Sequence, residues 1–237
     1  RVRATARADR AAVRPERPAG VRLVNRSVPP EAPRNCPLCP RLVAYRAVNA
    51  RENPDWFNGA AASFGDPQAR LLIAGLAPGR TGANRTGRPF TGDHAGWLLY
   101  ETLKKTGFAT GDYDARPDDS LRLDDCMVTN AVRCAPPGNK PLPVEEATCR
   151  PFLVSRLAAL PRLKVIVTLG DVSRRNVLKA LDLPATAVAP GHGVEARVRD
   201  YILLNSYHCS RLNTNTGRLT PEMFEAIFRR ARVLIEG

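Results

Sequence analysis

The feature that most constrains the fold is an alternation, from Asp66 onward, between short apolar runs and longer segments with apolar residues at helical spacing. Such alternation is typical of βαβ units, which build a mostly parallel sheet covered by helices. The expected strands cover residues 71–76, 126–132, 164–169 and 201–206, and the expected helices cover residues 95–106, 143–160, 171–181 and 221–235. We therefore predict an α/β fold, a three-layer α/β/α sandwich with a central, mostly parallel four-stranded sheet.

The chain is strongly basic, with 36 Lys and Arg residues against 23 Asp and Glu residues and a formal net charge of +13. This excess predicts a polyanionic partner, either nucleic acid or a membrane surface. Residues 1–34 contain nine Arg, three acidic residues and no aromatic residue, a composition that buries too little apolar surface to order a chain. We therefore expect a flexible basic arm over residues 1–34 and one folded domain over residues 35–237.

The cellular compartment follows from what the sequence lacks. No apolar run approaches the ~20 residues that a membrane-spanning helix needs, and the arginine-rich start has no apolar secretory core. We therefore expect a cytoplasmic protein without a membrane segment. Six cysteines in such a chain favour metal ligation or buried thiols over a disulfide framework.

Four of the cysteines have the pattern of a metal site. Cys36 and Cys39 form a Cys-x-x-Cys pair on a proline-flanked turn, and Cys134 and Cys149 are the natural candidates for two further ligands. By spacing alone, a structural zinc ion and a [4Fe-4S] cluster are about equally compatible with four thiolates. The other two cysteines are expected to be buried as small apolar side chains: Cys126 and Cys209.

A glycine-rich loop follows the first expected strand, at the sheet edge where open α/β sheets bind ligands. Residues 75–93 contain five glycines, yet they match neither the dinucleotide fingerprint G-x-G-x-x-G nor the Gly-Lys-Ser/Thr of a phosphate-binding loop. The absence of both motifs weakens the interpretation of this loop as a binding site for a nucleotide cofactor. What remains is a loop that brings backbone close to a ligand, with one aromatic side chain, Phe90, and one carboxylate, Asp93.

Three blocks resemble the uracil-DNA glycosylase superfamily, specifically its iron–sulfur branch called family 5 or type B. They are GLAPG with NRTGRPFTGD (residues 75–79 and 84–93), NAVRCAPPGNKP (residues 130–141) and SYHCSRLNTNTGRLT (residues 206–220). With the cysteine spacing, the resemblance covers the chain from residue 35 onward. It implies a glycosylase-like α/β/α fold and a [4Fe-4S] cluster on the four cysteines. It also implies a monofunctional DNA repair enzyme that hydrolyses the N-glycosidic bond of uracil and other deaminated bases, hypoxanthine and xanthine, and leaves an abasic site.

The resemblance also implies roles for individual side chains. Phe90 would stack on a base extruded from the duplex, and Asn130 would pair with the edge of that base. His208 would donate a hydrogen bond to O2 of the departing base, where negative charge develops. Asp93 and Asn139 would hold the attacking water, and the carboxylate would also face the positive charge on the sugar.

Further residues are expected to line the base pocket or to contact DNA. Gly75, Ala77 and Gly79 belong to the pocket. Several branches of the superfamily have a carboxylate or an amide at the position of Ala77, so we expect Asp93 to engage the water and purines to be less strongly excluded. Leu212, in a polar loop, would fill the gap left by the flipped base. Phosphate contacts are expected from four arginines: Arg85, Arg88, Arg211 and Arg218.

Each of these roles has a structural alternative. Phe90 would be a core aromatic, Asn130 would satisfy backbone at a strand end, and His208 would be a satisfied structural histidine. Asp93 is also suited to cap the following helix. Asn139 would be an ordinary turn residue, since Gly-Asn after proline is common in turns. Leu212 would be a loop anchor packed on the last helix.

Two other classes of function compete with a glycosylase. A non-catalytic iron–sulfur protein that binds nucleic acid would need only the cysteines and the charge. A zinc-stabilised nucleotide hydrolase is disfavoured because the chain lacks a phosphate-binding lysine motif. The expected partner is double-stranded DNA containing deaminated bases, with single-stranded DNA as a further candidate. We expect a monomer that is associated with the nucleoid when it is bound to DNA.

Overall fold

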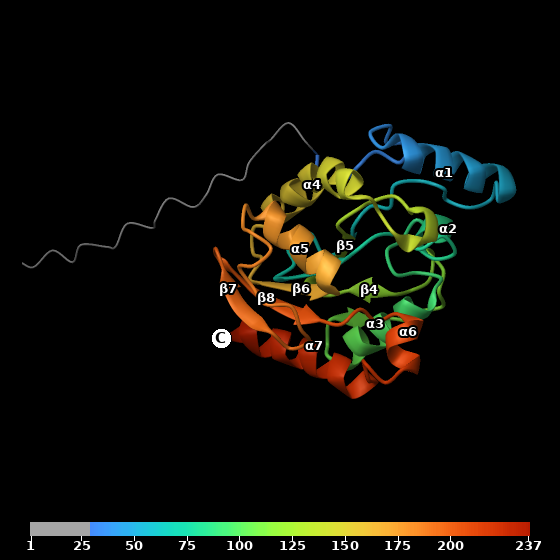
Figure 1. Cartoon of the computed structure of the whole chain (residues 1–237). Helices are drawn as coiled ribbons and strands as arrows, with labels where there is room; N and C mark the ends of the chain where they lie inside the picture. The colour runs from blue at the N-terminus through green and yellow to red at the C-terminus, as the bar shows by residue number, and fades with distance from the viewer. Residues whose placement is uncertain (1–28) are drawn as a thin grey trace, which may run out of the picture.

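A computed structural model of the chain describes residues 29–237 (Figure 1). Within these residues, the central sheet has six strands in the order β1-β5-β2-β6-β8-β7. The four inner strands are parallel: β5 (Cys126–Asn130), β2 (Leu71–Gly75), β6 (Val165–Leu169) and β8 (Tyr201–Ser206). The edges are antiparallel: β1 (Phe64–Gly65) pairs with β5, and β7 (Glu195–Val198) pairs with β8. The four predicted parallel strands are therefore confirmed, and two short edge strands extend the sheet.

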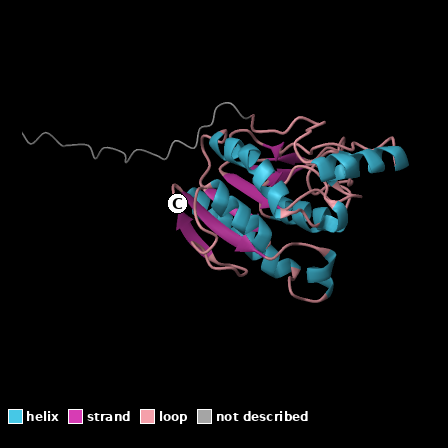
Figure 2. Ribbon diagram, turned by 45° about the horizontal axis from the view of Figure 1, so that its top comes forward, coloured by secondary structure: helices cyan, strands magenta, loops and turns pink. Residues whose placement is uncertain are grey.

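Helices cover both faces of the sheet, as predicted for a three-layer sandwich (Figure 2). One face packs against α3 (His94–Lys105) and α7 (Pro221–Glu236). The other face packs against α4 (Pro143–Ala158) and α5 (Asp171–Ala180). All four helices were expected, with ends within a few residues of these bounds.

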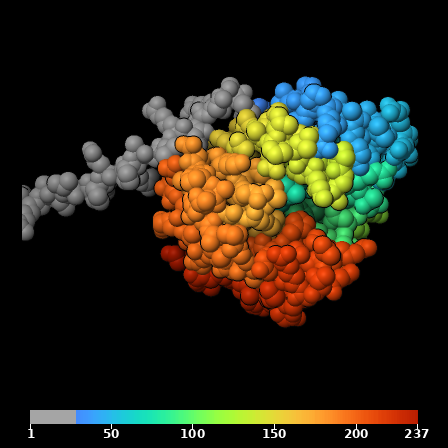
Figure 3. Space-filling view, in the orientation of Figure 1, coloured from blue at the N-terminus to red at the C-terminus, as the bar shows by residue number. Residues whose placement is uncertain are grey.

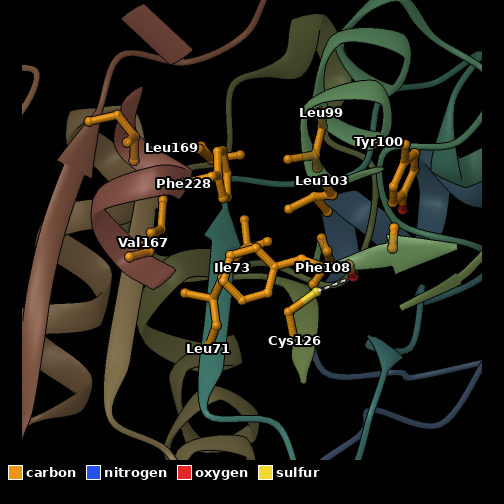
Figure 4. Close-up of a cluster of buried hydrophobic side chains, with 14 of the residues drawn as sticks. Leu71, Ile73, Leu99, Tyr100, Leu103, Phe108, Cys126, Val167, Leu169 and Phe228 are labelled. Carbon is orange, nitrogen blue, oxygen red and sulfur yellow. Dashed lines mark hydrogen bonds between the residues drawn. The ribbon is translucent and has the colours of Figure 1, made fainter. Parts of the chain in front are cut away.

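The sheet has a hydrophobic core on each face, and this explains why the sequences of the inner strands are continuous apolar runs. Successive side chains of a strand point to opposite faces, so Leu71 and Ile73 enter the core beneath α3 and α7, whereas Leu72 and Ala74 enter the other core. Figure 4 shows the first core, where Leu71 and Ile73 lie among leucines of α3 and Phe228 of α7.

Six further elements complete the described part of the chain. They are α1 (Pro40–Glu52), α2 (Ala83–Thr86), β3 (Ala109–Thr110), β4 (Arg122–Leu123), the 3-10 turn η1 (Pro137–Asn139) and α6 (Arg211–Asn215). The helix α6 corrects the expectation that Leu212 lies in a loop. Ser210 caps this helix, because its side chain accepts a hydrogen bond from the backbone N–H of Asn213 at 3.4 Å.

The start of the folded domain also differs from the prediction. Most of the expected arm, residues 1–28, lies outside the described residues, but Pro30 and Glu31 pack on the domain. The Pro30 carbonyl accepts a hydrogen bond from the guanidinium of Arg133 at 3.2 Å, and the Glu31 carboxylate pairs with Arg133 at 3.3 Å and with Arg156. Since Arg133 is fully buried, its charge would cost ~3–5 kcal/mol without such a partner. The packed domain therefore begins by residue 30, and not at residue 35.

None of the helices in residues 29–237 combines the length and the apolar character that crossing a membrane requires.

Candidate functional site

A cavity of about 360 Å³ lies at the carboxyl ends of the parallel strands. In Figure 3 the surface is hollowed between the yellow segments of α4 and the orange-red segments that follow β8. Side chains from four separate parts of the sequence meet there. Seven of the residues predicted to form the site line this cavity: Ala77, Gly79, Phe90, Asp93, Asn130, Asn139 and His208.

Asn130 and Phe90 form one wall of the cavity. Gly75, which was also predicted to belong to the pocket, lies behind them and does not line it. Asn130, the last residue of β5, is 2 % exposed, and its side-chain oxygen Oδ1 has no hydrogen-bond partner among the described residues. Gly75 lies opposite in the sheet register, where a Cβ would stand 2.5 Å from that oxygen and 2.6 Å from Cζ of Phe90. Only glycine leaves room for both groups. A buried amide oxygen without a partner, beside an aromatic ring, suits a planar ligand that carries N–H donors.

Asp93 caps α3 and also lines the cavity. Its Oδ1 caps α3 by accepting the Gly96 N–H at 3.2 Å. Its Oδ2 faces the glycine-rich loop, where a Cβ at Gly82 would collide with it and one at Gly79 would stand 3.1 Å away. One oxygen therefore holds the helix, while the other lies at the cavity wall.

His208 follows β8 and faces Phe90 across the cavity, with 6.1 Å between the ring centroids. Its backbone is held by Asn213, whose side-chain amide donates to the His208 carbonyl at 2.7 Å. Burial lowers the pKa of His208, and the charge of Asp93 acts in the opposite direction. The imidazole is therefore neutral at neutral pH and can donate one N–H to a ligand oxygen.

Asn139 reaches the cavity mouth from the η1 turn. Its φ is +57°, a left-handed conformation that asparagine tolerates better than most residues. The turn is tied to α1 by Arg41, whose guanidinium donates to the Lys140 carbonyl at 3.1 Å and pairs with Glu145 at 2.7 Å. The position of Asn139 thus depends on the helix that follows the Cys-x-x-Cys pair.

The four predicted metal ligands surround one small cavity between the start of α1, the end of β5 and α4. The backbone N–H of Arg133 donates to Sγ of Cys149 at 3.3 Å, and the guanidinium of Arg46 lies 3.8 Å from Sγ of Cys134. Burial raises the pKa of Cys134 to about 12 and that of Cys149 to about 11. A thiol must lose its proton to bind a metal, so a positively charged centre is needed to offset this desolvation.

The donor set fits an iron–sulfur cluster, because four thiolates are its usual ligands and hydrogen bonds to sulfur are its usual environment. Within residues 29–237, no three His, Cys, Asp or Glu side chains stand close enough together to hold one metal ion. The ligands of a [4Fe-4S] cluster bind four different iron atoms and so stand further apart than those of one ion. The remaining cysteines, Cys126 and Cys209, are fully buried as predicted.

Comparison with known proteins decides the family. The model of the uracil DNA glycosylase superfamily matches residues 62–232, which include the glycine-rich loop and the segments after β5 and β8. The chain belongs to this superfamily. The type-5 uracil-DNA glycosylase of Thermus thermophilus is 44 % identical over 206 residues, which cover 84 % of this chain and 93 % of the relative. Those of Pyrobaculum aerophilum (39 %; 83 % and 88 % covered) and Mycobacterium bovis (40 %; 84 % and 78 % covered) are also similar.

Three of the arginines expected to contact DNA are exposed in this superfamily member. Arg211 lines the cavity mouth. Arg218 stacks over the ring of Tyr207 at 4.6 Å and lines a second hollow of about 530 Å³, which adjoins the cavity. Arg85 donates to two carbonyls of the glycine-rich loop. Leu212, the neighbour of Arg211 in α6, is 72 % exposed.

Arg88 does not fit its predicted role as a DNA contact. It is 6 % exposed, and its guanidinium makes two hydrogen bonds of 2.7 Å to the carboxylate of Asp119 and one of 2.8 Å to the Thr91 hydroxyl. A guanidinium with its donors directed inward cannot bind a phosphate. The partner carboxylate lies 31 residues further along the chain, so residue type alone could not reveal this pairing.

His94 lines the cavity and was missed by the sequence analysis. Its Nε2 lies 3.0 Å from the hydroxyl of Thr214, which donates its own hydrogen to the carbonyls of Ser210 and Arg211. The hydrogen bond between His94 and this hydroxyl joins the start of α3 to α6. One signal in the sequence could have identified it: His94 is one of three histidines in the chain and directly follows Asp93.

The environment of His208 predicts how it titrates. The pKa of His208 in the folded protein should lie below the ordinary value of 6.5, and Asp93→Asn should lower it further by removing a nearby negative charge. NMR of the imidazole protons against pH, with His208→Ala for assignment, measures both effects. A value at or above 6.5 in the folded protein would contradict the structure.

Proposed function

We propose that this protein is a uracil-DNA glycosylase of the family 5 kind. It hydrolyses the bond between uracil, or another deaminated base, and deoxyribose, and it releases the free base and leaves an abasic site. The observation that carries the proposal is the buried Oδ1 of Asn130, which has no partner in the described part of the chain and lies beside Phe90. The type-5 glycosylases to which the chain is similar support the same reaction.

The cavity suits this reaction in geometry and charge. A base extruded from DNA would stack on Phe90 and present its edge to Asn130. The neutral imidazole of His208 would donate to O2 of the base, where negative charge grows in the transition state. On the other side, the carboxylate of Asp93 would stabilise the oxocarbenium-like sugar and, with Asn139, hold the attacking water.

A base-release assay tests this function. On a duplex with one uracil, the wild-type protein should release free uracil, and Asp93→Asn and His208→Ala should each slow single-turnover cleavage by roughly 10²–10³-fold. Binding to abasic product DNA should change little. Asp93→Asn is informative because asparagine caps a helix about as well as aspartate, so the variant removes mainly the charge.

The matched control is Asp66→Asn. Asp66 forms a turn at the opposite end of β2, where it accepts the Gln68 N–H at 2.7 Å, and an amide there should leave the rate unchanged. An Asp93→Asn protein that cleaves at the wild-type rate would reduce Asp93 to a helix cap. If DNA is bound but no base is released, the non-catalytic iron–sulfur protein becomes the better description.

The proposed partner is double-stranded DNA, with single-stranded DNA as a second substrate. Arg85, Arg211 and Arg218 would contact phosphates, and the exposed Leu212 would fill the gap left by the extruded base. We propose that the protein acts as a monomer. A DNA substrate supports a cytoplasmic location, at the nucleoid when the protein is bound.

The proposed cofactor is a [4Fe-4S] cluster held by Cys36, Cys39, Cys134 and Cys149. When bound, the cluster would serve as a structural cross-link between α1 and α4. Cys149→Ser should lose iron, sulfide and visible absorbance, whereas Cys126→Ser, a change at a buried thiol outside the site, should keep them. Stoichiometric zinc without iron in protein purified under anaerobic conditions would refute this assignment.

Substrate breadth follows from Ala77 on the cavity wall. A small apolar side chain there leaves space for a larger purine and offers no polar group that would discriminate against it. Hypoxanthine and xanthine should therefore be released as well as uracil. Uracil should be removed best opposite guanine, because a mispaired base unstacks more easily. Single-turnover rates on duplexes with each base, repeated with Ala77→Asn, measure this. Strict uracil activity in the wild-type protein would contradict it.

A further inference from the structure

Phe90 holds a backbone conformation that is unusual for its side chain. Its φ is +53°, in the left-handed region that bulky residues rarely adopt. The ring nevertheless lies at the cavity wall, beside Asn130 and opposite His208. The surroundings must therefore hold this backbone in place.

Two buried tyrosine hydroxyls bind the backbone at this point. Tyr100 of α3 donates to the Pro89 carbonyl at 2.5 Å, and Tyr113 donates to the Phe90 carbonyl at 3.1 Å. The Tyr113 hydroxyl also accepts the N–H of Gly92 at 3.3 Å. One hydroxyl thus bonds the peptide groups on both sides of Thr91 and fixes the turn that carries Phe90.

The segment that carries Tyr113 is itself anchored to the same loop. Residues 111–121 join β3 to β4, and Asp119 within them pairs with Arg88, two residues before Phe90. The Asp119 side chain is fully buried and also accepts the N–H groups of Asp114 and Leu121. Burial acts to raise the pKa of Asp119, but its hydrogen bonds, first among them those from Arg88, lower it overall, and the pair stays ionised.

We propose that Tyr113 is a positioning residue for base recognition, which acts by holding Phe90 in the left-handed conformation that presents its ring to the cavity. This inference rests on the proposed function, because it assumes that Phe90 stacks on the base. It assigns a role to residues 111–121, a segment that does not line the cavity. Because Asp119 and Arg88 anchor the two segments independently, loss of the Tyr113 hydroxyl should release Phe90 without unfolding the domain.

The test is Tyr113→Phe, with Tyr201→Phe as the matched control. Tyr201 is a half-buried tyrosine at the start of β8, at the opposite end of this strand from the cavity. Tyr113→Phe should slow single-turnover uracil release by about tenfold, the effect of losing one or two hydrogen bonds, and should leave binding to abasic DNA unchanged. Tyr201→Phe should leave both unchanged, and the two variants should have similar unfolding temperatures.

A double-mutant cycle separates positioning from general damage. In a Phe90→Leu background, Tyr113→Phe should cause no further loss of rate, because the ring that it positions is gone. Equal losses in both backgrounds, or a wild-type rate for Tyr113→Phe alone, would overturn the proposal.

A second measurement does not depend on activity. Amide hydrogen exchange at Gly92 should be at least about tenfold faster in Tyr113→Phe, which removes the acceptor of that N–H, and unchanged in Tyr201→Phe. Unchanged exchange in Tyr113→Phe would overturn the proposal even if the rate fell. If the wild-type protein releases no base, the proposed function fails, while the exchange still shows whether Tyr113 holds the loop.

Discussion

The parallel pairing of β2 with β5 on one side and β6 on the other is the constraint on which the site depends. Parallel strands end at one edge, so the segments that follow β2, β5 and β8 meet there, although they are far apart in sequence. The register sets Gly75 against Asn130 at this edge, and Phe90 packs into the space that the glycine leaves. A shift of one residue would turn Asn130 toward the other face of the sheet.

The inner strands were predictable because burial on both faces gives a continuous apolar run. The main helices were predictable because burial on one face gives apolar residues at helical spacing. The edge strands β1 and β7 were not, since they are short and half exposed and carry no such pattern.

The partners of charged side chains could not be predicted either. Arg85 and Arg88 stand in one motif, yet Arg85 is exposed and Arg88 is buried against Asp119, and only the fold reveals which carboxylate is near. Glu31 likewise belongs to the domain because of arginines that lie more than a hundred residues away.

The cavity residues were predictable as a set, from their motifs, but the conformations that make them useful were not. Phe90 and Asn139 both have positive φ, and the Asn130 oxygen is buried without a partner among the described residues. Each feature costs stability, and each lies at the cavity wall or mouth. At Phe90, the hydrogen bonds from Tyr100 and Tyr113 to the loop hold the backbone in this conformation.

The cysteine cavity is mechanically connected to the cavity at the sheet edge. Cys134 and Cys149 bracket the turn that carries Asn139, and Arg41, two residues after Cys39, holds the same turn through the Lys140 carbonyl. A cluster bound by these cysteines would therefore fix both ends of the segment whose middle reaches the cavity. A purely structural cofactor suffices for such an arrangement, because the required effect is a fixed position for one side-chain amide and not the transfer of an electron.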